Sequence, residues 1–65
     1  MRITITDIRK AGHCVSGARR WFETQDMDFR DFLKDGIDSK VLLDTGDAFA
    51  VNVVRLKRER DGSNG

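Results

Sequence analysis

Three glycines divide this chain into segments that leave room only for brief helices or strands. Gly12, Gly36 and Gly46 each follow a stretch with apolar residues at helical spacing, and glycine is the residue that most often ends a helix. With 65 residues in total, we expect one domain, which on folding buries only about 60% of the surface of the unfolded chain. The glycine spacing therefore predicts an all-α fold, a small orthogonal bundle of four or five short helices.

Helical spacing occurs in five segments, and a short polar residue stands at the start of most of them. The segments are residues 6–11, 14–24, 29–35, 39–45 and 48–60. A threonine or aspartate at such a position accepts hydrogen bonds from the first backbone N–H groups of a helix. The expected N-caps are Thr6, Asp28, Asp38 and Asp47. We expect the domain to span residues 1–60, with a disordered polar tail over residues 61–65.

Residues 48–56 leave a strand interpretation open. Phe49, Val51 and Val53 alternate, and valine favours strands. Ala48 and Ala50 are poor strand residues, however, and the alternation is not strict, so a helix is favoured. Alternation over residues 2–5 predicts a short extended stretch at the beginning of the chain.

The apolar residues on these helical faces predict a single core. Its expected members are Val15, Ala18, Trp21, Phe22, Phe29, Phe32, Leu33, Ile37, Leu42, Leu43, Ala50 and Val54. The last segment is also expected to bury Phe49, Val51, Val53 and Leu56. Cys14 lies on the apolar face of the second segment and is expected to be a small buried residue.

The sequence offers little material for catalysis or metal binding. His13 and Cys14 are the only histidine and the only cysteine, so the chain holds no complete Cys/His zinc site and no internal disulfide. The two are neighbours in sequence, and no third residue that would orient them is evident. The acidic run that starts at Asp26 fails the calcium-loop pattern at Arg30, Asp31 and Ile37. We expect no enzyme activity, no cofactor and no metal.

Charge is distributed unevenly along the chain. Residues 1–20 carry a net charge of +4, residues 21–50 carry −5 and residues 51–65 carry +2. The basic beginning supplies the candidate contacts for a nucleic acid or a protein partner, which are Arg9, Lys10, His13, Ser16, Arg19 and Arg20. Two short helices around Gly12 are compatible with a helix-turn-helix that would offer Ser16, Arg19 and Arg20 to DNA. A net charge of only +1 favours the plainer interpretation, a solvated basic face.

Half of the chain resembles a known helical family. Trp21 and Phe22 form an aromatic pair, and residues 29–43 read FRDFLKDGIDSKVLL. This part resembles a SAM-like domain in its phenylalanine pair, its Gly-Ile-Asp turn and its double leucine, although Ser39 stands where that family usually has glycine. The resemblance implies a helical bundle that associates with proteins. The whole chain also resembles short proteins of tailed phages and prophages, in residues 17–22, 36–37 and 45–48.

These features favour a non-enzymatic phage or prophage accessory protein that acts as a small helical protein-interaction module. The alternative is a small DNA-binding or regulatory protein that uses the basic face of residues 9–20. The sequence does not identify the protein partner, and the acidic middle and basic ends also suggest a homo-oligomer. No apolar run approaches the ~18 residues that span a bilayer. We expect a protein without membrane contact in the cytoplasm of a bacterial host cell.

Overall fold

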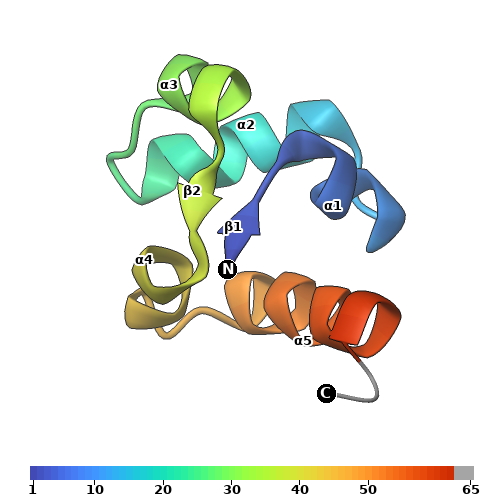
Figure 1. Cartoon of the computed structure of the whole chain (residues 1–65). Coiled ribbons are helices and arrows are strands. Elements are labelled where there is room, and N and C mark those ends of the chain that lie inside the picture. Colours follow the sequence, from blue (N-terminus) through green and yellow to red (C-terminus); the bar gives the residue numbers. More distant parts are fainter. Residues whose placement is uncertain (63–65) are drawn as a thin grey trace.

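The computed structural model describes residues 1–62 of the chain and shows a small all-α bundle. In chain order the elements are β1 (Arg2–Ile3), α1 (Ile5–Lys10), α2 (Val15–Thr24), α3 (Phe29–Asp35), β2 (Ile37–Asp38), α4 (Ser39–Asp44) and α5 (Ala48–Gly62). The five short helices point in different directions around a pair of two-residue strands (Figure 1). The predicted fold class is therefore confirmed, and the helix over residues 48–62 rules out the strand interpretation of that segment.

Local hydrogen bonds explain where the helices begin. The carboxylates of Asp28, Asp38 and Asp47 accept backbone N–H bonds from the first turns of α3, α4 and α5, so these three predicted N-caps are confirmed. The predicted cap at Thr6 is wrong. Thr4 is the N-cap of α1, because the Asp7 carboxylate reaches back and accepts the Thr4 backbone N–H at 2.8 Å.

The predicted extended stretch is shorter than expected and has a partner that the sequence did not indicate. Arg2 and Ile3 form β1, which pairs antiparallel with Asp38 and Ile37 of β2. Ile37, which was expected in the core, is therefore a half-buried strand residue. Gly36, at a φ of +76°, turns the chain from α3 into β2.

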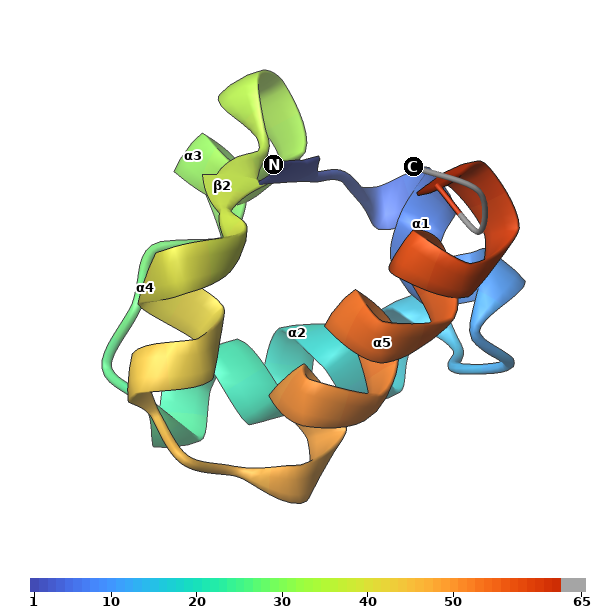
Figure 2. The ribbon, with the colours of Figure 1, turned by 60° about the horizontal axis from the view of Figure 1, so that its bottom comes forward.

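The helices lie around a common centre (Figure 2), and their buried side chains form one hydrophobic core. Its buried members are Ile3, Ile8, Ala18, Phe22, Phe32, Leu42, Ala50, Val53 and Val54. Val53 is buried as predicted, whereas Ile3 and Ile8 were missing from the predicted core. Ile3 is buried through the pairing of β1 with β2, which brings it against the helices. Trp21 lies at the edge of the core, with its ring centroid 4.6 Å from that of Phe49.

Several predicted core residues lie on the surface instead. Val15, Leu33 and Val51 are 42%, 49% and 45% exposed. Successive helix residues point about 100° apart, so when Phe32 faces the core, Leu33 turns outward, and Ala50 displaces Val51 in the same way. Cys14 is also exposed, because it is the N-cap of α2 and precedes the buried face.

The end of α5 differs from the expected domain boundary. The helix continues through Asp61 to Gly62, where a disordered tail was expected from residue 61 onward. An ion pair between Lys57 and Asp61, at 3.6 Å, connects two turns of this last part of the helix. Residues 63–65 of the expected tail lie outside the described part of the chain.

Candidate interaction surface

The six predicted contact residues lie on three separate parts of the surface. Ser16, Arg19 and Arg20 lie on α2 and line one shallow hollow together with Glu23. Arg9 and Lys10 belong to the last turn of α1 and line another hollow with Thr6. His13 lies in the loop between these helices and faces α5. The structure therefore does not bring the six together into one binding face.

The group on α2 is the most regular of the three. Ser16, Arg19, Arg20 and Glu23, which we call the α2 patch, follow one another at the spacing of a helix face and surround a hollow of about 220 Å³. All four side chains are exposed. Glu23 places a carboxylate beside the two guanidinium groups, which reduces the attraction of this patch for a phosphate.

His13 has a packing role. Its ring lies on Phe49, with a centroid separation of 4.6 Å, and its Nε2 is 3.5 Å from Nδ2 of Asn52. These contacts hold the loop between α1 and α2 against α5. They also direct the ring toward α5, away from the arginines of the α2 patch.

Cys14 caps α2 through its sulfur. Sγ accepts the backbone N–H of Gly17 at 3.3 Å and lies 3.5 Å from Oγ of Ser16. The bonds from Ser16 and Gly17 hold the pKa of the thiol below its ordinary value. Within residues 1–62, no group of three or more His, Cys, Asp and Glu side chains is placed to hold a metal ion.

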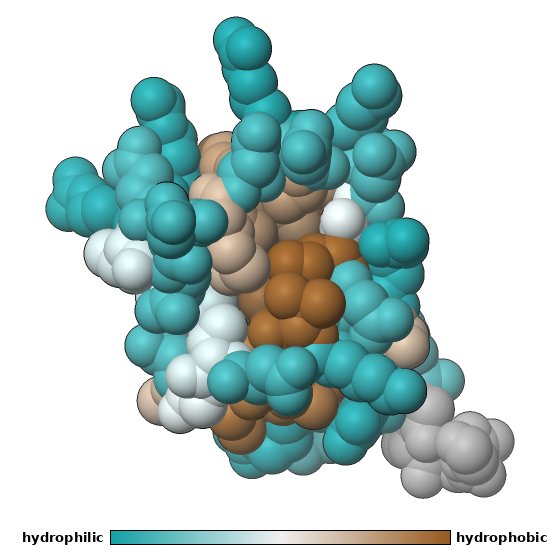
Figure 3. All heavy atoms as spheres, turned by 90° about the vertical axis from the view of Figure 1, so that its left-hand side faces the viewer, coloured by the Kyte–Doolittle hydropathy of each residue, from teal (hydrophilic) through white to brown (hydrophobic). Residues whose placement is uncertain are grey.

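A larger hollow lies between α2, α3 and β2. We call it the α3 hollow: it has a volume of about 380 Å³ and is lined by Phe22, Met27, Asp28, Asp31, Phe32, Asp35, Gly36 and Ile37. Apolar side chains gather in the middle of the face that carries α3, β2 and α4, and hydrophilic side chains border them (Figure 3). Sequence reasoning assigned only a capping role to Asp28 and found no site in the acidic run, although the spacing of Asp28, Asp31 and Asp35 places them along one side of α3.

The three carboxylates at the rim of the α3 hollow, Asp28, Asp31 and Asp35, differ in the hydrogen bonds that they make. Asp28 caps α3, and its Oδ1 accepts the N–H groups of Arg30 and Asp31 at 2.9 and 3.2 Å. The carboxylates of Asp31 and Asp35 take part in no ion pair or hydrogen bond within the described residues 1–62. The rim therefore has negative charge that the fold itself does not neutralise.

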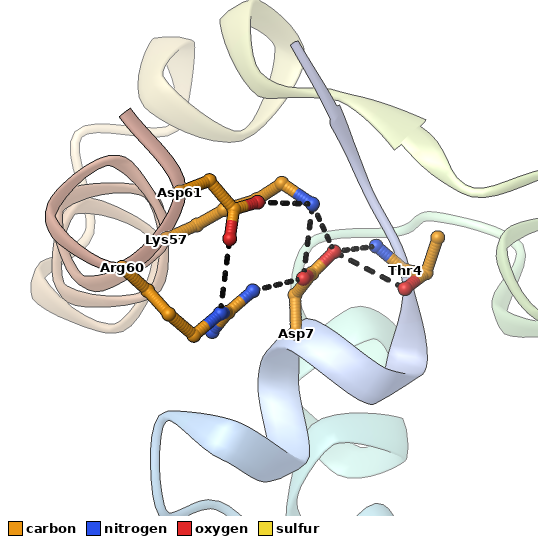
Figure 4. Close-up of polar contacts among 5 residues, drawn as sticks. All are labelled: Thr4, Asp7, Lys57, Arg60 and Asp61. Atoms are coloured by element: carbon orange, nitrogen blue, oxygen red, sulfur yellow. Dashed lines mark hydrogen bonds and ion pairs between the residues drawn. The ribbon is translucent and has the colours of Figure 1, made fainter. Parts of the chain in front are cut away.

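Sequence reasoning also missed an ionic cluster around the buried Asp7, which we call the Asp7 cluster: Asp7, Lys57 and Arg60 together with Thr4. The Lys57 ammonium lies 3.0 and 2.9 Å from the two oxygens of Asp7, and the Arg60 guanidinium lies 2.6 Å from Oδ1 (Figure 4). Burial alone raises the pKa of Asp7, but the bonds from Thr4, Lys57 and Arg60 outweigh it and hold that pKa below its ordinary value. The cluster joins α1 to α5. Two cations of the basic end of the chain, Lys57 and Arg60, are paired with Asp7 in it.

The chain was also compared with known proteins. No protein-family model, no curated protein and no solved structure matches it. In the part of the chain that the structure describes, every helix is too short or too polar to cross a membrane.

Proposed function

We propose that this chain is a non-enzymatic protein-interaction module and that the α3 hollow is its docking surface. The observation that carries the proposal is a hollow lined by the half-buried apolar side chains of Met27 and Ile37. Beside them, the carboxylates of Asp31 and Asp35 form no ion pair within the described residues. Exposed apolar surface bordered by polar residues is typical of sites where proteins meet. We further propose that the module is a phage or prophage accessory protein that acts in the cytoplasm of the host, as its resemblance to short phage proteins suggests.

The placement of the chemically active side chains supports a binding role over a catalytic one. Sγ of Cys14 bonds to Ser16 and Gly17, while the His13 ring is engaged with Phe49 and Asn52. A nucleophile and its base need to lie within hydrogen-bond reach of each other, and these two side chains use their contacts elsewhere.

Photo-crosslinking through Met27 tests the proposal. The chain contains two methionines, Met1 and Met27, and Met27 lines the α3 hollow. Protein that carries photo-methionine at both positions is irradiated in host lysate, and crosslinked peptides are identified by mass spectrometry. The control is Met27→Leu, which keeps an apolar side chain of similar size and leaves the probe at Met1 alone.

A distinct crosslinked protein that disappears with Met27→Leu supports the proposed docking surface. The same crosslinks in both variants would place the partner elsewhere on the molecule. The absence of any crosslink through Met27 would count against an interaction role for the α3 hollow.

DNA binding is a second candidate, favoured by the two adjacent arginines of the α2 patch. Arg19 and Arg20 lie on the outer face of α2, which is the helix that a helix-turn-helix would insert into the major groove. A mobility-shift assay at two salt concentrations tests this candidate, because binding to phosphate weakens steeply with salt. Arg19→Ala with Arg20→Ala should abolish the shift, whereas Arg58→Ala on α5 should leave it unchanged.

Self-association through the acidic middle and the basic ends stays a prediction. The Asp7 cluster reduces the basic surface that is free for it, because Lys57 and Arg60 already contact Asp7. Arg55 and Arg58 remain as exposed cations of α5. Light scattering at low and high salt measures such association, which should weaken as salt screens the charges.

A further inference from the structure

We infer that the α3 hollow accepts a short segment of a partner protein that carries one large apolar side chain flanked by arginine or lysine. This inference rests on the proposed function, because it names the chemistry of the partner at that same site. Three features of the hollow lead to it: the nature of the floor, the charge of the rim and the size of the space.

The floor of the α3 hollow is suited to an apolar anchor. Phe22 and Phe32 line the hollow with their ring centroids 4.6 Å apart, but they are 0% and 3% exposed, so they form a packed apolar wall with almost no accessible surface of their own. Met27 and Ile37 are half-buried at its sides. Met27 and Ile37 therefore supply the apolar surface that an anchor can contact, and methionine adapts its flexible side chain to the shape of a ligand. A polar side chain in this place would lose its hydration without a hydrogen-bond partner.

The rim of the α3 hollow selects the charge of the occupant. Asp31 and Asp35 stand one turn apart on α3, which puts their Cβ atoms about 5–6 Å from each other. A partner that covers the hollow removes water from these carboxylates, and this costs free energy unless cations replace the water. Arginine is the most suitable cation, because its guanidinium can bind a carboxylate through two parallel hydrogen bonds. The same carboxylates repel an acidic protein and the phosphates of a nucleic acid.

The size of the space favours a foreign partner over a second copy of this chain. Val15 and Val51 are exposed and are each followed one turn later by an arginine, so they have the required combination of groups. A valine side chain has only three carbons, however, and is small against a hollow of about 380 Å³. Leu33 is larger but lies on α3 itself, beside the same carboxylates, so a second copy that inserted it would bring like charges together. A tryptophan, phenylalanine or leucine from another protein fills the space better.

Fluorescence anisotropy with synthetic peptides tests the inference on the full chain. The probe is a labelled twelve-residue peptide with one central tryptophan, two arginines on each side of it and serine or glycine elsewhere. Two control peptides replace either the tryptophan by alanine or the four arginines by glutamate. We expect binding of the first peptide, and binding at least about tenfold weaker for each control.

The protein variant is Asp31→Asn with Asp35→Asn, which keeps the shape of the rim and removes its free charge. The matched control is Asp26→Asn with Asp44→Asn, which changes the net charge equally at exposed positions outside the lining. Asp26 has a φ of +57°, which asparagine tolerates well, so this control should fold. Circular dichroism checks both variants.

We expect the rim variant, Asp31→Asn with Asp35→Asn, to bind the first peptide at least about tenfold more weakly than the wild type. The control variant, Asp26→Asn with Asp44→Asn, should keep its affinity. Equal losses in the two variants would show attraction by net charge alone and would overturn the inference. Equal binding of the tryptophan and alanine peptides would overturn it as well, since the apolar floor would then be unused. A concentration-dependent dimer of the protein alone that the rim variant abolishes would make a second copy the occupant instead.

These outcomes are distinguishable from a failure of the proposed function. A partner crosslinked through Met27 whose contact segment lacks basic residues would leave the docking function intact and refute only the inference. Peptide binding that depends on Asp31 and Asp35, without any crosslinked partner in lysate, would support the inferred chemistry of the hollow and count against the proposed cellular role.

Discussion

Asp7 and Lys57 are fifty positions apart in the chain, yet the Lys57 ammonium contacts both oxygens of the Asp7 carboxylate. The Asp7 side chain is only 5% exposed, while that of Lys57 is 19% exposed. The carboxylate also accepts the Thr4 backbone N–H, so a single side chain both begins α1 and holds α5 against it. Closing so long a loop costs entropy, and each contact that spans it supports the fold of a small domain.

Acid should destabilise the protein through Asp7. The pKa of its carboxyl is lower in the folded protein than the ordinary value of 3.8, so the unfolded chain binds the proton more readily. The stability that Asp7 contributes is therefore complete above that ordinary value and is lost as the pH falls through the folded pKa. Urea unfolding between pH 7 and pH 2 should show this loss, to which Asp38, whose pKa is also lowered by its bond from Lys40, contributes.

Asp7→Asn isolates the charge of this residue. The amide oxygen can still accept the Thr4 N–H, so the helix cap survives while the attraction to Lys57 and Arg60 is lost. Hydrogen bonds to charged groups contribute about 1.5–3 kcal/mol each, so we expect a loss of at least about 2 kcal/mol at pH 7 and a flatter pH profile. The control is Asp61→Asn, whose half-exposed carboxylate contacts the same two cations and should matter by less than about 1 kcal/mol. Equal effects of the two variants would contradict a special role of Asp7.

The sequence predicted the helices well because their signals are local. Glycines in the left-handed region end α1, α3 and α4, and aspartates begin three of the helices, within a few residues of the backbone groups that they satisfy. The pairing of β1 with β2 and the Asp7 cluster join residues more than thirty positions apart, and one sequence holds no local signal for such partners. The capping part of Asp7 was predictable, since it stands three residues after Thr4.

Phe32 and Leu33 should respond very differently to truncation, although they are neighbours on α3. Phe32 is 3% exposed and contacts Phe22 and Phe29, so Phe32→Ala removes about 3–5 kcal/mol. A core of this size supplies only about that much stability, and the variant should be largely unfolded. Leu33→Ala should change stability by less than about 0.5 kcal/mol, because that side chain is 49% exposed. Circular dichroism during thermal unfolding measures both, and a cooperative melt of Phe32→Ala near that of the wild type would contradict the core assignment.

The candidate surface was harder to predict than the helices. The apolar side chains of Met27 and Ile37 meet the acidic residues of α3 only after α2, α3 and β2 have packed together. The sequence shows the carboxylates at positions 28, 31 and 35, but caps and solvated helix faces have the same pattern. The six basic and polar residues chosen from the sequence were close in the chain, and the turn at Gly12 separated them in space.

Cys14 should be replaceable by serine but less so by alanine. Its Sγ caps α2 by accepting the Gly17 N–H, and serine is a stronger N-cap acceptor than a thiol. We expect Cys14→Ser to be at least as stable as the wild type and Cys14→Ala to lose about 0.5–1 kcal/mol. Differential scanning fluorimetry compares the melting temperatures, and an added chelator should leave them unchanged. A chelator-dependent melt would revive a metal role for this residue, and equal stability of the two variants would refute the capping role.

Gly36 and Gly46 separate two effects that a glycine can have at a turn. Both have positive φ, at +76° and +70°, so alanine at either site is strained by at least roughly 1–2 kcal/mol. The strain is larger at Gly36, because its ψ of −171° lies in a region that essentially only glycine adopts. A Cβ at Gly46 would meet no atom within 4 Å, whereas a Cβ at Gly36 would lie 2.9 Å from the backbone oxygen of Ile3. Gly36→Ala must therefore also push β1 away from β2, and with it Ile3 out of the core. We expect Gly46→Ala to fold with reduced stability and Gly36→Ala to lose its cooperative unfolding transition. Similar urea midpoints for the two variants would show that the close approach of β1 to Gly36 contributes nothing beyond the strain of the turn.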